Sequence, residues 1–340
     1  MSRRLPVYLL LDCSESMAGK PLEAVEAGVR SMIGTLKKNP YALETAFISV
    51  ITFDARARTV IPLTELFSVV PPTLSIKPGT ALGAALTLLR ESIQRDVVRT
   101  DHNVQGDWQP LVFILTDGTP TDEWREPADC LKGLASVAAT VYAIGCGEEA
   151  DFTVLNQVAD ECLHLTELSP ESLAKLFVWL SAGVQSMSST PEKKIDLRKI
   201  PLEKGIEEVD RSKPPKKVPT DRFQYLHVMC ATHRKYYMLR YLRDHLKGVY
   251  SCQDLVKLPA DFFSEGTMKS QPVKLGWLHG CLPCPYCENG SWILCNSCKK
   301  LSCFEHKSIG NFWTCPFCGK GSIVVAGDGA SSMLVEGSQG

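Results

Sequence analysis

The sequence predicts an α/β protein in which a doubly wound domain is followed by a small cysteine-rich domain. Apolar runs alternate with stretches of helical spacing through residues 1–185, which is the pattern of a parallel sheet with helices on both faces. Two of these runs, Leu5 to Leu11 and Leu111 to Leu115, end in carboxylate and hydroxyl residues. All but four of the fourteen cysteines lie at or after Cys230, and this split divides the chain in two.

Each element is expected from its own pattern. Continuous apolar runs predict buried strands, and apolar residues spaced three and four apart, such as Val25, Val29 and Met32, predict helices. The last helix is expected to begin after the N-cap Ser169, with Pro170 at its first position. We expect strands at 5–11, 45–53, 57–63, 111–115, 140–146 and 162–166, and helices at 21–36, 80–93, 122–139, 152–159 and 169–184.

Composition sets the expected domain boundaries. Residues 1–185 form the first domain, and residues 186–220, rich in Ser, Pro, Lys and Glu, are predicted to be a linker. A β-rich and metal-binding domain is expected at 221–325, followed by a flexible tail at 326–340. Within that domain the run from Tyr236 to Leu246 has the residue types of a strand but a helical leucine spacing, so both elements stay open.

The overall charge and hydropathy exclude several classes of protein. The formal net charge is −1, so nothing global indicates a nucleic acid or an anionic membrane as partner. No apolar run approaches about 20 residues, the length that a membrane span needs. The first apolar run closes at Asp12 without a small-residue cleavage site, which predicts a strand and not a signal peptide. We expect a cytoplasmic protein, in which free thiols persist.

Five oxygen-bearing residues predict a magnesium site at the carboxyl edge of the sheet. Asp12, Ser14 and Ser16 follow the first strand, Thr80 precedes a helix, and Asp117 follows a later strand. The carboxyl ends of parallel strands are where ligands collect in open α/β sheets. Carboxylates and hydroxyls are hard donors, which suit Mg²⁺ or Mn²⁺ better than zinc.

These residues resemble the metal-ion-dependent adhesion site of von Willebrand factor A (VWA) domains, in the order Asp-x-Ser-x-Ser, Gly-Thr-x-Leu-Gly and Leu-Thr-Asp-Gly. The resemblance implies that the two serines and Thr80 touch the metal. It also implies that Asp12 and Asp117 act mostly through water and that an acidic side chain of a partner completes the coordination. Glu15 departs from the family, in which this position is often glycine. A carboxylate at the rim would lower the affinity for acidic ligands or bind metal itself.

Four pairs of ligand residues, each with two intervening residues, predict a zinc module near the C-terminus. Eight donors indicate two closed tetrahedral sites, because structural zinc takes four ligands, and soft thiolates select zinc over magnesium. A segment this short has little core, so metal must supply much of its folding free energy. The pairs are Cys284 with Cys287, Cys295 with Cys298, Cys303 with His306, and Cys315 with Cys318.

The spacing leaves the pairing of these ligands open. Interleaving, which we favour, resembles RING-type modules, whereas nesting would join the first pair to the last, as in a zinc ribbon. Cys230 and His233 share the two-residue gap, but one pair makes no site, and Cys252 and Cys281 have no obvious partner. The interleaved sites are Cys284, Cys287, Cys303 and His306 for one ion, and Cys295, Cys298, Cys315 and Cys318 for the other.

A VWA domain, a linker and a C-terminal cysteine-rich domain together resemble the long TerY-type proteins of bacterial tellurium-resistance and stress systems. The match rests on the adhesion-site motif and on the frame Cys-Pro-Tyr-Cys … Cys-Pro-Phe-Cys. The resemblance implies a protein without enzymatic activity that is associated with a Ser/Thr protein kinase and a PP2C-type phosphatase.

The leading hypothesis is therefore a scaffold that binds an acidic or phosphorylated group of a partner through Mg²⁺ at the VWA site. In a narrower version, Glu207 or Glu208 of the linker, or an acidic residue of the zinc domain, occupies that site within the same chain, because a tether gives a high effective concentration.

Two other classes are weighed against the scaffold. A metal-dependent hydrolase needs a base near the metal, and Asp54, Asp122 and His102 are the candidates, although a turn, a helix cap and a solvated loop explain them equally well. A zinc-module adaptor, either RING-like or nucleic-acid binding, is compatible with the zinc spacing and with several lysines in the module.

Overall fold

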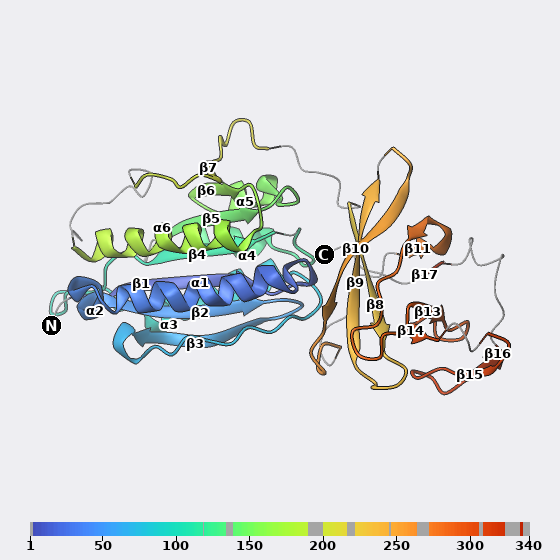
Figure 1. Ribbon diagram of the computed structural model, residues 1–340. Coiled ribbons are helices and arrows are strands. Elements are labelled where there is room, and N and C mark those ends of the chain that lie inside the picture. The colour runs from blue at the N-terminus through green and yellow to red at the C-terminus, as the bar shows by residue number, and fades with distance from the viewer. Residues whose placement is uncertain are drawn as a thin grey trace. The chain divides into compact units, whose positions relative to one another are not determined.

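The structure of the chain is a computed structural model with two compact units, residues 1–218 and 219–340. Each unit is described by itself (Figure 1). The described residues are 3–117, 119–133, 139–189, 200–215, 222–244, 246–263, 272–305, 309–323 and 334–335.

A seven-stranded sheet forms the framework of the first unit, in the order β3-β2-β1-β4-β5-β6-β7. The five inner strands run parallel, and the two edge strands run antiparallel to their neighbours. This topology confirms the doubly wound α/β class. The strands are β1 (Leu5–Asp12), β2 (Ala46–Phe53), β3 (Ala57–Glu65), β4 (Leu111–Thr116), β5 (Thr140–Cys146), β6 (Glu161–Leu165) and β7 (Ile206–Glu208).

Helices cover both faces of this sheet. α1 and α6 lie side by side across one face (Figure 1). Gly28 of α1 permits their close approach, because a Cβ there would lie 2.0 Å from the Phe177 ring of α6. On the other face, Leu86 and Leu89 of α3 pack in one buried cluster with Tyr8 of β1. The helices are α1 (Lys20–Leu36), α2 (Pro40–Thr45), α3 (Leu82–Asp96), α4 (Arg125–Lys132), α5 (Phe152–Val158) and α6 (Pro170–Ser189).

The central strands β1 and β4 are buried over their whole length, as their continuous apolar runs predict. Their register places Leu11 opposite Leu115, so the two strands reach the carboxyl edge of the sheet together. A fully buried leucine side chain contributes about 1.5–3 kcal/mol to the free energy of unfolding. The residues that follow β1 and β4 are therefore positioned by two well-packed strands.

The segment expected to be a linker is partly folded onto the first unit. Its residues 206–208 form β7, which pairs with β6 at the edge of the sheet. Ile206 is 4% exposed and Val209 is 7% exposed, and burial of these two apolar side chains stabilises an otherwise polar segment. Glu207 and Glu208 thus lie three strands away from β4, roughly 14 Å at the usual strand spacing. This placement overturns the hypothesis that either glutamate occupies the metal site.

The second unit is built on a six-stranded sheet, in the order β12-β10-β9-β8-β14-β13. The run from Tyr236 is a strand, because β8, β9 and β10 form an antiparallel meander. β14 pairs in parallel with β8, with Leu301 opposite Val228. Val335, in the expected tail, is buried and pairs with Val273. The strands are β8 (Phe223–Met229), β9 (Tyr236–Asp244), β10 (Val249–Lys257), β11 (Val273–Lys274), β12 (Leu278–His279), β13 (Ser291–Leu294), β14 (Leu301–Phe304), β15 (Phe312–Thr314), β16 (Gly321–Ile323) and β17 (Leu334–Val335).

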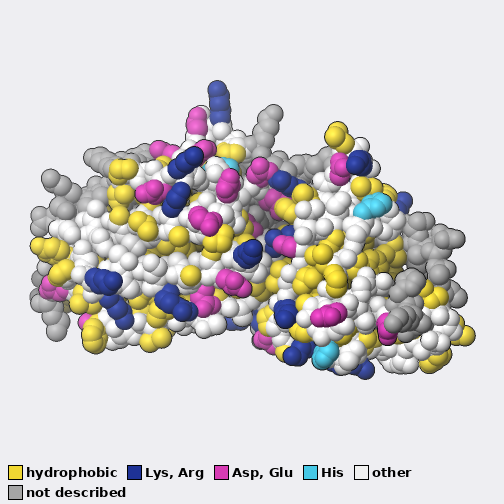
Figure 2. All heavy atoms as spheres, viewed as in Figure 1, with side chains coloured by type: hydrophobic (Ala, Val, Ile, Leu, Met, Phe, Trp, Pro, Cys, Tyr) yellow, Lys and Arg dark blue, Asp and Glu magenta, His cyan; other side chains and the backbone are white. Residues whose placement is uncertain are grey.

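The surface is mixed in charge on the face that Figure 2 draws, where acidic and basic side chains are interspersed. Such a face has no broad field of one sign that would steer a polyanion towards it. Within the described parts of the chain, no helix combines the length and the apolar character that a bilayer crossing requires.

Candidate functional site

The first candidate site lies where β1 and β4 end. Asp12 is the last residue of β1, and Asp117 directly follows β4. A backbone hydrogen bond from Lys77 N to Cys13 O, at 3.1 Å, joins the loop that carries Thr80 to the loop after β1. The parallel sheet therefore brings together the three loops that carry the five predicted oxygen ligands.

Four of these five residues form a continuous hydrogen-bonded chain. The Asp12 carboxylate accepts from Ser14 N at 2.9 Å and from Thr116 Oγ1 at 2.5 Å. The Ser14 and Ser16 hydroxyl oxygens lie 2.9 Å apart, and Ser16 donates to Asp117 Oδ1 at 2.7 Å. All of these side chains are buried, so their oxygens converge in one polar cluster beneath the surface.

Thr80 supplies the fifth oxygen, and its hydroxyl is unsatisfied. The residue is 1% exposed, and its Oγ1 has no hydrogen-bond partner among the described residues. Its backbone is held nevertheless, because Thr80 N donates to Thr121 Oγ1 at 3.1 Å and Thr80 O accepts from Thr121 N at 2.9 Å. An unpaired buried hydroxyl costs about 1–3 kcal/mol, a cost that a bound cation would offset.

The electrostatics of the site also favour a cation. Burial, and next the charge of Asp117, raise the pKa of Asp12 above its ordinary value. A third buried carboxylate, Asp54, is neutralised by Arg58 at 2.6 Å. Asp12, Asp117 and the unpaired Thr80 hydroxyl together form a hard-oxygen donor set that fits Mg²⁺ or Mn²⁺.

Glu15 differs from its expected place at the rim of the site. The residue is 3% exposed and lies in a buried 3-10 turn, Glu15–Met17. Its backbone carbonyl closes this turn by accepting from Ala18 N at 3.1 Å. The carboxylate of Glu15 is therefore not presented on the surface, where it would repel an incoming acidic group.

The acids considered as catalytic bases have structural roles. Asp122 accepts from Gly83 N at 3.0 Å and from Ala84 N at 2.9 Å, and so caps α3. Gly83 lets the Asp122 loop approach, because a Cβ there would lie 1.9 Å from Glu123 O. The ion pair with Arg58 and this cap account for Asp54 and Asp122 without a catalytic role.

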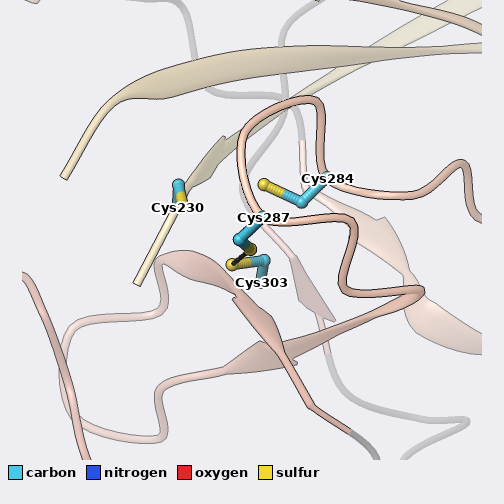
Figure 3. Close-up of side chains that lie close together, drawn as sticks. All are labelled: Cys230, Cys284, Cys287 and Cys303. Carbon is cyan, nitrogen blue, oxygen red and sulfur yellow. Dashed lines mark hydrogen bonds between the residues drawn. The ribbon is translucent and has the colours of Figure 1, made fainter. Parts of the chain in front are cut away.

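The second kind of candidate site is built from thiols in the second unit. Figure 3 shows Cys230, which follows β8, converging with Cys284, Cys287 and Cys303, and their four Sγ atoms all lie within 4.8 Å of one another. The Sγ atoms of Cys287 and Cys303 are 3.5 Å apart. A tetrahedral zinc with bonds of about 2.3 Å sets its sulfurs about 3.8 Å apart, so this first quartet has the dimensions of a zinc site.

A second quartet meets the same distance limit. Its members are Cys295, Cys298, Cys315 and Cys318. The Sγ atoms of Cys295 and Cys318 are 3.8 Å apart, and those of Cys298 and Cys315 are 3.6 Å apart. These four residues are the set predicted for the second ion, and the ligand pairs are grouped by interleaving and not by nesting.

The first quartet differs from the predicted set in one member. Cys284, Cys287 and Cys303 come together as predicted, whereas His306 lies outside the described residues. Cys230 holds the fourth place, because the parallel pairing of β14 with β8 brings the end of β8 beside Cys303. The sequence signal for Cys230 is its two-residue gap to His233, which matches the gaps of the other pairs.

Of the remaining candidates in this unit, His233 contacts a member of the first quartet, whereas Cys252 and Cys281 are not members of a quartet. His233 N donates to Cys230 Sγ at 3.3 Å, and His233 Nδ1 lies 3.4 Å from the same sulfur. Cys252 and Cys281 belong to neither quartet in the described part of the chain. Cys281 Sγ instead donates to Leu282 O at 3.4 Å.

Four of the residue pairs with a two-residue gap share one kind of turn. In each, the first cysteine donates its N–H to the carbonyl five residues on and accepts the N–H four residues on, at 2.8–3.0 Å. The residue after each pair has a positive φ. Three of these residues are not glycine, and each such conformation costs about 1–2 kcal/mol. The turns begin at Cys230, Cys284, Cys295 and Cys315, and the positive-φ residues are Arg234, Glu288, Lys299 and Gly319.

The thiols of each quartet ionise unequally. Burial opposes ionisation of Cys230, but hydrogen bonds from His233 and the neighbouring cysteines lower its pKa below that of an ordinary thiol. Burial and the neighbouring sulfurs raise the pKa of Cys303. The same division separates Cys295, whose pKa is lowered, from Cys298, whose pKa is raised. A divalent cation would let the remaining thiols ionise, since metal binding releases protons from such ligands.

A parallel α/β sheet with acidic and hydroxyl residues at its carboxyl edge defines the class of adhesion-type metal-site domains. The profile of the von Willebrand factor type A domain matches residues 7–176, half of the chain. The chain belongs to the von Willebrand factor type A domain family, whose domains are generally non-catalytic interaction modules and often depend on a metal.

The relatives that match are similar over part of their length. The uncharacterized protein sll0103 of Synechocystis sp. strain PCC 6803 is 32% identical over 169 residues, which are 46% of this chain and 36% of that protein. Proximal thread matrix protein 1 from the mussel byssus, solved with a zinc-occupied MIDAS motif, is 22% identical over 54% of this chain and 48% of that one, with a TM-score of 0.39. The ArnB paralog VWA2 from Sulfolobus acidocaldarius is 15% identical over 76% and 67%, with a TM-score of 0.38. The chain thus spans less than half of the length of the first two relatives.

Proposed function

We propose that the first unit is a metal-dependent protein-binding module. Asp12, Ser14, Ser16, Thr80 and Asp117 would hold a Mg²⁺ or Mn²⁺ ion, and that ion would offer an open position to a carboxylate or phosphate oxygen of a partner protein. The observation that carries the proposal is the buried Thr80 hydroxyl, which lacks a partner among the residues that the structure describes. Membership of the VWA family supports a scaffold rather than an enzyme.

The residues of the site are arranged so that little has to move. The hydrogen bonds through Ser14 and Ser16 fix their hydroxyls against Asp117, and Thr121 fixes the backbone of Thr80. Such support holds binding groups near their productive geometry. When no cation is present, Asp12 and Asp117 repel each other. Because the partner would bind through the metal ion, its binding would be switchable by metal.

We further propose that two Zn²⁺ ions close the two cysteine quartets as structural sites. The sulfur separations and the four matching turns support this assignment. Cys230 would be the fourth ligand of the first ion, in the place that the sequence gives to His306. The second unit would then act as a zinc-stabilised adaptor, which is the alternative function that the cysteine pattern favours.

The finer biological setting rests on the resemblance of the motifs. We propose a cytoplasmic role in a bacterial tellurium-resistance or stress-response system, with a Ser/Thr protein kinase and a PP2C-type phosphatase as partners. The net charge of −1 and the mixed charges on the face in Figure 2 favour protein over nucleic acid as the partner.

Affinity capture with the full chain tests the proposed function. The bait is incubated with native lysate in Mg²⁺-containing and Mg²⁺-free buffer, without a chelator that would also remove zinc. A partner should be captured with Mg²⁺ and lost both without it and in Asp117→Ala. Asp101→Ala, in the exposed loop before β4 and so at the opposite end of the sheet, is the matched control and should capture normally. Capture by Asp117→Ala at the unchanged level would contradict a metal-bridged contact.

A further inference from the structure

We propose that the second unit carries a separate pocket that binds an acidic peptide by enclosing one of its aromatic side chains. The pocket has a volume of about 50 Å³ and is open to solvent, so the inserted side chain would be enclosed only in part. Its lining combines four rings, one leucine and two ammonium groups: His227, Tyr236, Phe263 and Phe317, Leu301, and Lys299 and Lys300.

The rings form a cup and not a platform. The ring centroids of Tyr236 and Phe263 are 4.6 Å apart at an interplanar angle of 65°, and those of His227 and Phe263 are 5.3 Å apart at 83°. Phe317 closes another side, 6.0 Å from Tyr236 at 45°. A nucleobase stacks on the flat face of an exposed ring, whereas inclined rings offer edge-to-face contacts to an inserted aromatic side chain. The shape thus favours a peptide over a single-stranded nucleic acid.

The charge around the cup determines what flanks the inserted side chain. Lys300 Nζ lies 5.2 Å from the centroid of Phe317, so an ammonium group borders the apolar wall. Two further ammonium groups, of Lys235 and Lys257, lie over the ring of Tyr286, whose hydroxyl donates to Tyr236 O at 3.0 Å. None of the described lining residues is acidic. An aromatic residue beside Asp or Glu therefore complements both the cup and its rim.

The second cysteine quartet positions two walls of this pocket. Lys299 has the positive φ of the Cys295 turn, and Lys300 O accepts from Cys295 N at 3.0 Å. Phe317 lies inside the Cys315 turn, where its N–H donates to Cys315 Sγ at 3.4 Å. The pocket depends on these turns and not on the oxygen site of the first unit, so the two binding functions are separable.

Selection from a random heptapeptide library displayed on phage, against the zinc-loaded full chain, tests this proposal. We expect enrichment of Phe, Tyr or Trp next to Asp or Glu. The selected peptide, made synthetically, should bind the double variant Lys299→Gln/Lys300→Gln at least tenfold more weakly, with unchanged zinc content. The matched control is Lys247→Gln, an exposed lysine between β9 and β10, which should bind normally. Binding should persist without Mg²⁺ and in Asp117→Ala.

Four results would overturn the proposal. The first is the absence of an enriched aromatic–acidic pair. The second is equal binding of the selected peptide to the double variant and the control. The third is tighter binding of single-stranded oligodeoxythymidine than of the selected peptide, lost in the double variant, which would assign the pocket to nucleic acid. Loss of the peptide in Asp117→Ala would show instead that it binds at the oxygen site.

Discussion

The oxygen site of the first unit and the cysteine quartets of the second are organised in opposite ways. Four of the five oxygen donors lie at or just after the ends of buried strands in a seven-stranded sheet, and protein hydrogen bonds already hold these four. The quartets stand in loops and short strands, and the thiols of Cys230, Cys284 and Cys303 are themselves part of the buried cluster of that unit. The first site lies beside a core that its own residues do not build, whereas three cysteines of the first quartet are themselves core residues.

This difference determines what each metal contributes. In the first unit, packing fixes the geometry, and the proposed cation would add function. In the second unit, at least three strained turns must be stabilised, and a structural zinc supplies about 10–16 kcal/mol of apparent binding free energy at neutral pH. Metal removal should therefore abolish partner binding by the first unit without unfolding that unit, and should unfold the second unit.

Removal of zinc should have the largest effect. A chelator selective for soft metals should make the second unit sensitive to protease, because the proposed ions would supply much of its folding free energy, while the first unit remains as a protected fragment. Limited proteolysis followed by mass measurement shows this directly. Removal of Mg²⁺ by dialysis is the control and should leave both units protected. Protease resistance of the second unit without zinc would contradict the claim that this unit, unlike the first, needs its metal to fold.

Substitution of one quartet ligand should have the next largest effect. Cys230→Ser should lose one zinc ion per chain and lower the stability of the second unit, because the first quartet would lack its fourth thiolate. Cys252→Ser, a thiol outside both quartets, should keep both ions. Metal content after purification measures the difference. The outcome that contradicts the assignment is full zinc content in Cys230→Ser together with loss of an ion in His306→Gln.

Substitutions at two glycines of the first unit distinguish a general loss of stability from a local change in the geometry of the site. Gly83→Ala should cost about 1–3 kcal/mol through overpacking, because its Cβ would lie 1.9 Å from Glu123 O. The same shift should move the loop of Thr80 and weaken Mg²⁺ binding. Gly28→Ala meets the Phe177 ring at 2.0 Å, far from the site, and should be destabilised without a change in Mg²⁺ affinity. Urea unfolding and Mg²⁺ titration of both variants test this, and an equal loss of affinity in the two would argue against a local effect.

The cap of α3 should have the smallest effect. Asp122→Ala removes the acceptor of two helix N–H groups and should cost about 1 kcal/mol, measured by urea unfolding. The stoichiometry of Mn²⁺ binding should not change. Normal stability with complete loss of bound metal would instead make Asp122 a ligand.

The sequence predicts the elements and residues whose signals are local. Buried strands such as β1 and β4 are recognised as apolar runs, and parallel strands place their carboxyl ends at one edge of the sheet. The proximity of Asp12 and Asp117 could therefore be predicted from the sequence. The second quartet was also accessible, because its two pairs lie close in the chain and share one spacing. In both cases a short motif carries the geometry.

The features that the sequence did not reveal depend on long-range pairing. Cys230 joins the first quartet only because β8 and β14 are neighbours. The sequence of neither strand indicates that it pairs with the other. β7 is short and mostly charged, so the burial of Ile206 could not be inferred from its composition. The burial of Glu15 is likewise a property of the assembled loops and not of the motif.

The most direct test of the central claim is a Mn²⁺ titration of zinc-loaded Thr80→Val. The substitution removes a hydroxyl that has no partner in the described structure and keeps a similar volume. We predict at least tenfold weaker Mn²⁺ binding, about 1.4 kcal/mol or more, with an unchanged or higher free energy of unfolding when Mn²⁺ is absent. Thr87→Val, which loses a hydroxyl that donates to Gly83 O within α3, should bind Mn²⁺ normally. Unchanged Mn²⁺ affinity in Thr80→Val would contradict the claim that this site is built to hold a cation.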